Sequence, residues 1–413
     1  MPRFHIAHFT NTYLPFINGV SRSVENFRRG LTELGHNVFI FAPDADAYED
    51  TVPFVFRYPA IELPLQKYPL TIPVSTFIDK LLPALKLDVL HAHHPALLGQ
   101  VAAKKAQELD VPLVFTHHTR YRDYSHYVAA LPQNLVKDVI DRWVVDYMTK
   151  CQHVVVPSES IRAMLIDRYG ITERVSVVPT GVDVARFHEA NGRFLRQKYG
   201  WQEDIVLISA GRLAAEKNWP TLLEAFRLLL PDYPQCRLVI LGDGPERKNL
   251  ENLCRNLGIE KRVVWMGQVP FEEMPVFLKA ANIFCFASVT ETQGMVTLEA
   301  MAAGLPVVAV RASGTADFIT DGQEGFLTPN DSSALAEALK VLLTDNGRCQ
   351  QFGQAAYAKA QQFTIYNQAQ KMETVYQQAI ADKKAGYTIQ ADPQKPIFRI
   401  NWQKYLGVNL DWG

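Results

Sequence analysis

The most informative stretch of this 413-residue chain is Glu291-Thr-Gln-Gly-Met-Val-Thr-Leu-Glu299, which continues as Ala300-Met-Ala-Ala-Gly304-Leu-Pro-Val-Val-Ala309. Its pattern predicts a Gly-containing loop, an apolar helix that ends at Gly304, and a short β-strand. A helix N-terminus after such a loop offers unpaired backbone N–H groups and a positive dipole end, which suit an anion such as a diphosphate. The carboxylates of Glu291 and Glu299 can bind hydroxyl groups on the two sides of such a diphosphate. The stretch therefore predicts a binding site for a nucleotide-sugar.

The two glutamates have a simpler interpretation as solvent-exposed acids on a loop and a helix. Glu299, however, stands between Leu298 and the small residues that follow it, where an isolated charge is costly unless it has a partner. We therefore favour a buried, paired carboxylate at Glu299.

The same succession of loop, helix and strand runs through the whole chain. Short apolar runs rich in β-branched residues alternate with amphipathic helices such as Val20–Leu34 and Pro95–Glu108. The predicted strands are Ile6–Phe9, Val38–Phe41, Val89–His91, Leu113–Thr116 and Val154–Val156, then Ile205–Ala210, Arg237–Leu241, Val263–Met266, Ile283–Ala287, Val307–Val310 and Gly325–Leu327. This alternation is typical of an α/β protein with parallel, doubly wound sheets.

The length and the restart of the pattern predict two Rossmann-like domains facing a deep interdomain cleft. We place an N-terminal domain at residues 1–188 and a C-terminal domain at residues 189–364. A crossing helix at 365–382 and an extended tail at 383–413 then return toward the N-terminal domain. The tail contains two prolines and four aromatic residues, and we interpret it as a strap.

Composition excludes several functional classes. Apolar residues make up 48% of the chain and charged residues 21%, as in a globular enzyme. The net charge of -1 gives no support for nucleic acid as a partner. Five scattered cysteines form no CxxC pair, which indicates a reduced environment and neither disulfides nor a zinc site. Without a signal peptide or an apolar run of about 18 residues, we expect a cytoplasmic protein, with peripheral attachment to the inner face of the cell membrane left open.

Two cations follow the first strand of the second half, in Gly211-Arg212 and Glu216-Lys217-Asn218. The guanidinium of Arg212 and the ammonium of Lys217 can together neutralise a leaving diphosphate without a metal ion. The alternative, two solvated loop charges, is equally compatible with this spacing.

Two glycine-containing turns follow other strands. The stretch Leu241-Gly242-Asp243-Gly244-Pro245 is an incomplete dinucleotide fingerprint, because Arg247 occupies the position of the last glycine, and we interpret it as a structural turn. In Asn18-Gly19-Val20, Gly19 begins a helix at the ligand-binding edge of the sheet and would let a phosphate approach the backbone. A helix-entry turn is the alternative there.

Histidines gather after two strands of the first half. In Thr116-His117-His118-Thr119, at most one of the adjacent imidazoles is expected to face a ligand, where it could hydrogen-bond a sugar hydroxyl or stabilise charge. The cluster His91-Ala-His93-His94 has no partnering carboxylate motif. We therefore interpret it as satisfied histidines at a strand end and not as a metal site.

Taken together, these motifs resemble the retaining glycosyltransferases of family 4, which have the GT-B fold. The resemblance covers residues 1 to 382 and includes Pro179-Thr-Gly-Val-Asp183, in which we assign Asp183 a structural role and no catalytic one. It implies that Glu299 holds the ribose, that Glu291 holds the donor sugar, and that His118 lies near the transferred sugar. It further implies that the diphosphate is bound by side chains and amides of Arg212, Lys217, Gly294, Met295, Val296 and Gly19. Such enzymes need no metal or other cofactor and retain the anomeric configuration.

Within this family the stretch Thr116–Tyr127 is similar to that of bacterial 1,2-diacylglycerol glucosyltransferases, although Arg120 and the tail depart from them. The resemblance implies transfer of a hexose, most simply glucose, from a UDP-sugar to diacylglycerol. The alternatives are a soluble or polyprenyl-linked glycan acceptor, and a non-catalytic nucleotide-sugar-binding protein. Phe77–Lys86 and Tyr124–Val136 are candidate membrane contacts, and each is equally compatible with an amphipathic helix packed on the core.

Overall fold

The computed structural model describes residues 3–61, 69–127 and 132–395, which form two compact units. One contains the chain up to Gly181 and the chain from Ile365 onward, and the other contains Val182–Thr364. Helix α6 (Val184–Glu189), which the sequence places before the domain boundary, belongs to the second unit, because its Phe187 is buried in that unit's core. Residues 396–413 of the predicted tail lie outside the described residues.

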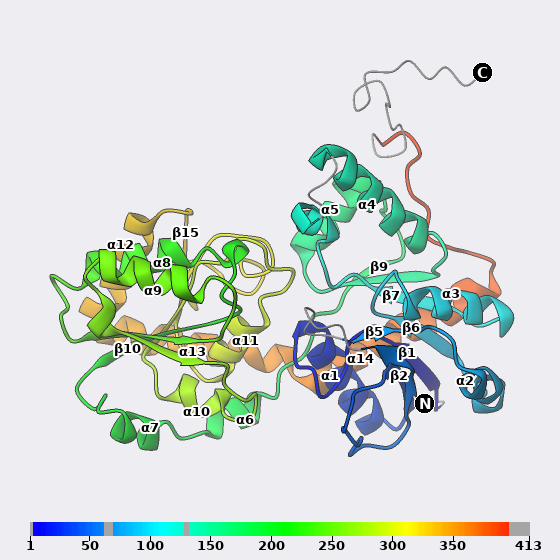
Figure 1. Ribbon diagram of the computed structural model, residues 1–413, viewed down its shortest axis with the longest axis horizontal. Helices are drawn as coiled ribbons and strands as arrows, with labels where there is room; N and C mark the ends of the chain where they lie inside the picture. The colour runs from blue at the N-terminus through cyan, green and yellow to red at the C-terminus, as the bar shows by residue number, and fades with distance from the viewer. Residues whose placement is uncertain (1–2, 62–68, 128–131, 396–413) are drawn as a thin grey trace. The chain divides into compact units, whose positions relative to one another are not determined.

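The first unit is built on a sheet of seven parallel strands in the order β3-β2-β1-β6-β7-β8-β9 (Figure 1). Alternate strand residues pack on helices on opposite faces, as period-2 alternation requires. One face is covered by α1 (Gly19–Glu33) and α14 (Ile365–Lys384). The other is covered by α2 (Thr76–Leu81), α3 (Leu98–Glu108), α4 (Gln133–Met148) and α5 (Glu159–Tyr169). The strands are β1 (His5–Phe9), β2 (Asn37–Pro43), β3 (Val55–Tyr58), β6 (Val89–Ala92), β7 (Leu113–Thr116), β8 (His153–Val156) and β9 (Val175–Val177).

The second unit is built on six parallel strands in the order β12-β11-β10-β13-β14-β15. Helices α8 (Trp219–Leu229), α9 (Arg247–Asn256) and α12 (Ser332–Thr344) cover one face. The other face carries α6, α7 (Arg193–Lys198), α10 (Met274–Lys279), α11 (Met295–Ala302) and α13 (Asn346–Ala360). The strands are β10 (Ile205–Ala210), β11 (Cys236–Leu241), β12 (Val263–Gly267), β13 (Ile283–Phe286), β14 (Val307–Val310) and β15 (Gly325–Thr328).

The predicted α/β class with two doubly wound, Rossmann-like units is confirmed, and each of the eleven predicted strands is present. The edge strands β3 and β9 were not predicted from the sequence, nor was the small antiparallel pair of β4 (Ala60–Ile61) and β5 (Leu70–Thr71).

The strand order reverses once in each sheet, between β1 and β6 and between β10 and β13. At such a switch point the connections leave in opposite directions, so the carboxyl edge of the sheet stays open for a ligand. We therefore expect a ligand to bind at the loops that follow these strands, β1 and β6 in the first unit and β10 and β13 in the second.

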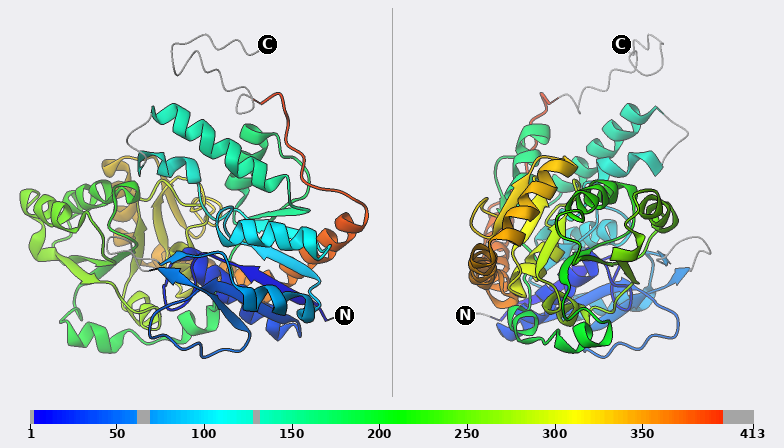
Figure 2. Two further views of the ribbon diagram at one scale, coloured as in Figure 1. Left: turned by 45° about the vertical axis from the view of Figure 1, so that its right-hand side comes forward. Right: turned by 90° about the vertical axis from the view of Figure 1, so that its left-hand side faces the viewer.

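The chain beyond the second unit packs on the first. Helix α14 lies beside α1, as both views of Figure 2 show, and the close approach occurs at Gly30. After α14 the chain continues along the unit, where Ile389 is buried and its N–H donates to the carbonyl of Cys151 at 2.9 Å. The strap predicted from the sequence is thus present in its described part.

Among the described residues, no helix is both long and apolar enough to cross a membrane. All five cysteines are free thiols, and four of them are buried.

The α1–α14 contact predicts a stability effect. A Cβ at Gly30 would lie 2.7 Å from the Cβ of Ala369 and 2.9 Å from the carbonyl oxygen of Ile365. Gly30→Ala should therefore lower the free energy of unfolding by about 1–3 kcal/mol, the usual cost of overpacking. Gly347→Ala on the exposed start of α13 is the control and should be neutral or stabilising. Thermal unfolding of the two variants checks this, and equal melting temperatures would contradict it.

Candidate functional site

The loops after β10 and β13 meet at the switch point of the second sheet. The Nζ of Lys217 lies 2.5 Å from Oε1 of Glu291, and both side chains are largely shielded from solvent. The side-chain amide of Asn218 donates to the backbone carbonyl of Ala287 at 3.0 Å, which adds a second tie between the two loops. The structure thus brings together two residues predicted for the site that are 74 positions apart in the chain.

Helix α11 begins directly after this loop. Its N-cap is Gly294, with a φ of 72°, a left-handed conformation that glycine adopts without strain. Among the described residues no side chain caps this helix. Glycine has no side chain to bond the first N–H groups, so those of Met295 and Val296 are available to an anion, as the sequence predicts.

Glu299 lies on the second turn of α11 and is 1% exposed. Leu298 and Ala300 beside it are equally buried in the core. The expectation that this carboxylate is buried is confirmed. An acid is rarely buried without a role, since the charge must be compensated.

Arg212 follows β10 and its residue is exposed, on the same loop as Lys217. Its carbonyl accepts a hydrogen bond from Nε1 of Trp219 at 3.0 Å, which fixes the loop backbone. The binding roles of Arg212, Lys217 and Glu299 remain predictions.

A group of hydroxyls at the same edge of the sheet was not predicted from the sequence. Among the buried side-chain oxygens of the described residues that have no hydrogen-bond partner are those of Ser209, Ser288, Thr297 and Thr315. A Cβ placed on Gly294 would lie 3.1 Å from Oγ1 of Thr315 and 3.6 Å from Oγ1 of Thr297. Buried hydroxyls without partners are costly, so their concentration here indicates a ligand that supplies them.

The loop after β14 is held against the site loop by backbone contacts. A Cβ on Gly314, whose φ is 78°, would lie 2.8 Å from the nitrogen of Gln293 and the carbonyl oxygen of Glu291. The Oγ of Ser313 donates to that same carbonyl at 3.0 Å. The run Ser313-Gly-Thr315 directly after a buried strand is the signal that could have revealed this loop from the sequence.

The turn at Leu241–Pro245 has the structural role expected. A Cβ on Gly242 would lie 1.9 Å from the carbonyl oxygen of Gly211, and one on Gly244 would lie 2.3 Å from that of Leu213. These glycines let two loops pack backbone to backbone, and this packing supports the loop that carries Arg212.

Gly19, in the first unit, is the exposed first residue of α1. The side chain of Asn18 caps this helix by accepting from the N–H groups of Val20 and Ser21 at 2.9 and 3.0 Å. Two of the amides that would bind a phosphate therefore already have a partner, and the role of Gly19 remains a prediction.

His118 belongs to a hydrogen-bonded series in the first unit, which we call the histidine chain. Its Nε2 is 2.9 Å from Nδ1 of His93, whose Nε2 is 2.7 Å from Nδ1 of His8. Nε2 of His8 is 3.4 Å from the hydroxyl of Tyr376, on α14. The series ends with His91, 2.7 Å from that hydroxyl and 2.6 Å from Oγ1 of Thr116.

Burial keeps these imidazoles neutral. It lowers the pKa of His118 and of His8 to about 3. It also lowers the pKa of His91 and His93 well below the ordinary value, and neighbouring imidazoles lower it further. Each ring therefore carries one N–H and one lone pair at neutral pH. The expectation of satisfied histidines at the strand end agrees with these hydrogen bonds.

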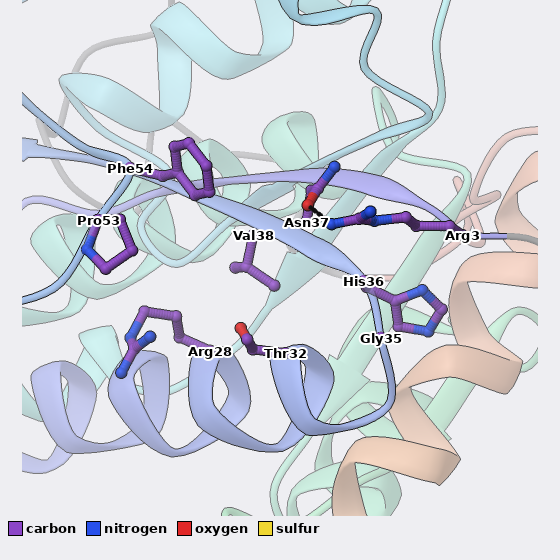
Figure 3. A pocket seen from close by; sticks show the side chains of 9 residues that line it. All are labelled: Arg3, Arg28, Thr32, Gly35, His36, Asn37, Val38, Pro53 and Phe54. Atoms are coloured by element: carbon purple, nitrogen blue, oxygen red, sulfur yellow. Dashed lines mark hydrogen bonds between the residues drawn. The ribbon is translucent and has the colours of Figure 1, made fainter.

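A separate pocket of the first unit is shown in Figure 3. It is formed where α1 ends and β2 begins, at the amino edge of the sheet and away from the switch point. Its cations have partners, since Arg28 pairs with Glu25 at 2.7 Å and Arg3 donates to Asn37. We assign it no role. Its lining residues are Arg3, Arg28, Thr32, Gly35, His36, Asn37, Val38, Pro53 and Phe54.

Comparison with known proteins agrees with this geometry. Residues 192–359 match the family described as glycosyl transferases group 1, and residues 17–186 match glycosyltransferase family 4. The alpha-monoglucosyldiacylglycerol synthase of Acholeplasma laidlawii is 33% identical over 343 residues, 79% of this chain and 85% of that protein. The synthase of the same name from Streptococcus pneumoniae is 31% identical over 360 residues, 82% of this chain and 78% of that protein.

Solved structures share the fold. HepE of Anabaena, in complex with UDP and glucose, has a TM-score of 0.74 at 21% identity, covering 91% of this chain and 100% of that one. The fold and these relatives therefore define a GT-B glycosyltransferase. The chain belongs to glycosyltransferase family 4, and the predicted enzyme class, a hexosyltransferase, is confirmed.

The position of Lys217 predicts weaker binding of a nucleoside diphosphate when its charge is removed. Lys217→Met should raise the dissociation constant about ten- to a hundredfold, the effect of losing one charged hydrogen bond. Lys248→Met, on the exposed surface of α9, is the control and should change it little. Calorimetric titration measures both constants, and equal affinities would remove Lys217 from the site.

The buried histidines predict loss of stability in acid. The pKa of His117 is about 4 in the folded protein against an ordinary value of 6.5, because burial disfavours its charge. Below pH 6.5 the unfolded chain binds more protons, so the stability present above that pH is lost progressively toward pH 4. The same holds for the histidine chain.

His117→Leu tests this directly, because neither ring nitrogen of His117 has a hydrogen-bond partner among the described residues. The melting temperature should fall less between pH 7 and pH 5 in this variant than in the native protein. His188→Leu, at an exposed position, is the control and should leave the native pH dependence intact. Parallel curves for His117→Leu and the native protein would contradict the assignment.

Proposed function

We propose that this glycosyltransferase moves glucose from UDP-glucose to a membrane lipid, 1,2-diacylglycerol, and retains the anomeric configuration. The observation that carries the donor half is the meeting of Lys217, Glu291 and the uncapped start of α11 at the switch point of the second sheet. A cation, a carboxylate and free helix amides are the groups that a sugar diphosphate requires.

The roles follow from these positions. Arg212 and Lys217 bind the diphosphate, with the amides of Gly294, Met295 and Val296. In the protein as described, the charge of Lys217 is balanced by Glu291. A diphosphate would take over Lys217, and the released carboxylate of Glu291 would accept hydrogen bonds from the hydroxyls of the sugar.

Glu299 would hold the ribose of the nucleotide. Two vicinal hydroxyls are well matched by the two oxygens of one carboxylate, which accepts hydrogen bonds only. Uridine as the base and glucose as the sugar are supported by the complex of HepE, whose fold this chain shares. They are supported further by two relatives named for monoglucosyldiacylglycerol.

The lipid acceptor is supported by the surface of the first unit. Exposed apolar side chains follow one another from β4 to α2, and Val74 and Phe77 are 64% and 66% exposed. Lys80 and Lys86 are exposed on the same segment, which suits an anionic headgroup layer. Large apolar residues gathered beside cations are typical of interfacial attachment. We infer that the protein is peripheral on the inner face of the cell membrane.

The second candidate membrane contact is less favourable. In the stretch Tyr124–Val136, residues 128–131 lie outside the described part. Arg122, just before it, is held by Asp141 at 2.5 Å and by Asp138 at 3.2 Å. The charge of Arg122 is therefore balanced by these two carboxylates of the protein.

Retention and metal independence belong to the same proposal. A glucosyl group that is α-linked in the donor and in the glycolipid has kept its configuration. Arg212 and Lys217 supply the positive charge that offsets the developing diphosphate, so we propose that no metal ion is needed. Neutral His118 would lie beside the transferred sugar.

Incubation of the full-length protein with UDP-glucose and vesicles of diacylglycerol in phosphatidylglycerol tests this function. Mass spectrometry of the organic phase should show one added hexose, and proton NMR should show an α-anomer. The rate should persist in excess EDTA. Transfer only to water-soluble glycans would overturn the lipid acceptor, and a β-anomer would overturn retention.

A matched control uses the apolar segment. Phe77→Ser should weaken vesicle sedimentation and glycolipid formation together, because it removes a large exposed apolar side chain. Phe194→Ser, at a similarly exposed phenylalanine of the second unit, should leave both nearly unchanged.

A further inference from the structure

Asn218 lies directly after Lys217 and adopts a left-handed backbone conformation, with a φ of 55° and a ψ of 36°. Asparagine is one of the few residues with a side chain that adopt this conformation readily. It joins the short 3-10 turn η3 (Ala215–Lys217) to helix α8. The backbone at Asn218 thus determines where the turn that carries Lys217 ends.

The side-chain amide of Asn218 has both of its N–H groups and its oxygen engaged. Its Oδ1 accepts from the hydroxyl of Thr221 at 2.9 Å. Its Nδ2 donates to the carbonyl of Ala287 at 3.0 Å and to Oδ1 of Asn330 at 2.7 Å. A backbone carbonyl can only accept, so the contact with Ala287 determines the orientation of the amide. Asn218 therefore joins the loop after β10 to the loops after β13 and β15.

The side chain of Asn218 does not have the usual structural role of an asparagine at the start of a helix. At that position the side-chain oxygen normally accepts from the second or third N–H group of the helix. Within the described part of the chain, Asn218 makes no such bond to the backbone of α8. Two of its three hydrogen bonds lead to neighbouring loops of the site edge instead.

A further neutral hydrogen bond lies on the other side of Lys217. The hydroxyl of Thr290 donates to the carbonyl of Glu216 at 3.3 Å. Glu216 directly precedes Lys217, and Thr290 directly precedes Glu291. The residues on both sides of Lys217 are therefore tied to the loop after β13, by bonds that involve neither charge of the ion pair.

The ion pair and the neutral hydrogen bonds act at different stages of donor binding. In the protein as described, the pair of Lys217 and Glu291 at 2.5 Å itself holds the two loops together. In the proposed function a diphosphate takes over Lys217, so this pair opens. The hydrogen bonds of Asn218 need not break when it does, and they then hold the loop that presents the ammonium.

We propose that Asn218 is a positioning residue that keeps the ammonium of Lys217 at the diphosphate once Glu291 has released it. This inference rests on the proposed function, in which the diphosphate displaces Glu291. Lysine carries its charge on a flexible four-carbon stem, so a loop that moves lowers the fraction of time the ammonium spends at the phosphate. A loop that is fixed before the ligand arrives reduces the entropy lost on binding.

A double-mutant cycle with Lys217 tests the proposal. Asn218→Gly removes the amide and still permits the left-handed conformation. The dissociation constant for UDP, measured by calorimetry, should rise about three- to tenfold, the effect of one neutral hydrogen bond. In the Lys217→Met background the same substitution should change it less than about twofold, because no ammonium remains to be positioned. An equal rise in both backgrounds would overturn the proposal.

Asn282→Gly is the matched control for a loss of stability alone. Asn282 directly precedes β13, at the amino edge of the same sheet, and its Oδ1 accepts from the N–H of Val206 at 2.8 Å. This variant should lower the melting temperature and leave the dissociation constant for UDP as it was. A rise equal to that in Asn218→Gly would show a general effect of stability and would overturn the proposal.

Asn218→Ala separates the side chain from the backbone. It removes the same hydrogen bonds and adds the strain of alanine in a left-handed conformation. The dissociation constant for UDP should rise in the alanine and glycine variants alike, and a rise in the alanine variant alone would assign the effect to strain and overturn the proposal. These titrations need no acceptor, so a native protein that binds UDP and transfers no sugar counts against the proposed function alone.

Discussion

Parallel strand pairing is the constraint on which the rest of this structure depends. Two parallel neighbours need a connection that returns the chain to the starting edge, so all their carboxyl ends lie on one side. Where the order reverses, between β10 and β13, successive connections leave in opposite directions and the edge is open. Lys217 and Glu291 meet there because each lies in a loop that follows one of these two strands.

The loops at that edge are shaped by close backbone contacts. Gly242 and Gly314 bring neighbouring loops to distances at which a side chain would collide with a carbonyl oxygen. With a φ of 72° at Gly294, the chain turns directly into α11 and leaves the first amides of the helix uncapped. The glycines therefore determine the site as much as the charged residues do, because they fix where the amides point.

The elements of the fold were predictable from the sequence because buried parallel strands are short, apolar and β-branched. β3 was not, since Val55-Phe-Arg-Tyr58 lies at the sheet edge and mixes a charge with partly exposed residues. The meeting of Lys217 with Glu291 and the burial of Glu299 were also predictable, because the two loops follow strands of one sheet and Glu299 stands among apolar residues. The hydroxyls of Ser288 and Thr315 were not, because serine and threonine are common in loops and only their burial marks them.

The contact between His8 and Tyr376 could not be predicted from the sequence. Nothing in the run Phe4-His-Ile-Ala-His8 connects it with Tyr376, which follows 368 positions later on α14. Only the pairing of β1 with β6 and the return of α14 to the first unit bring these groups together. The prediction from sequence identified His118 as one imidazole and could not show that it is hydrogen-bonded to His93.

The two units offer different electrostatic environments, positive in the second and neutral in the first, and the proposed chemistry needs both. The second carries Arg212 and Lys217 on one loop and has an uncapped helix start after Glu291, groups that suit the negative charge that grows on a departing diphosphate. The anomeric carbon of the transferred sugar becomes electron-poor as the diphosphate leaves, and it would repel a cation beside it. Burial holds the pKa of His118 at about 3, so this ring offers a dipole without a positive charge across the physiological pH range.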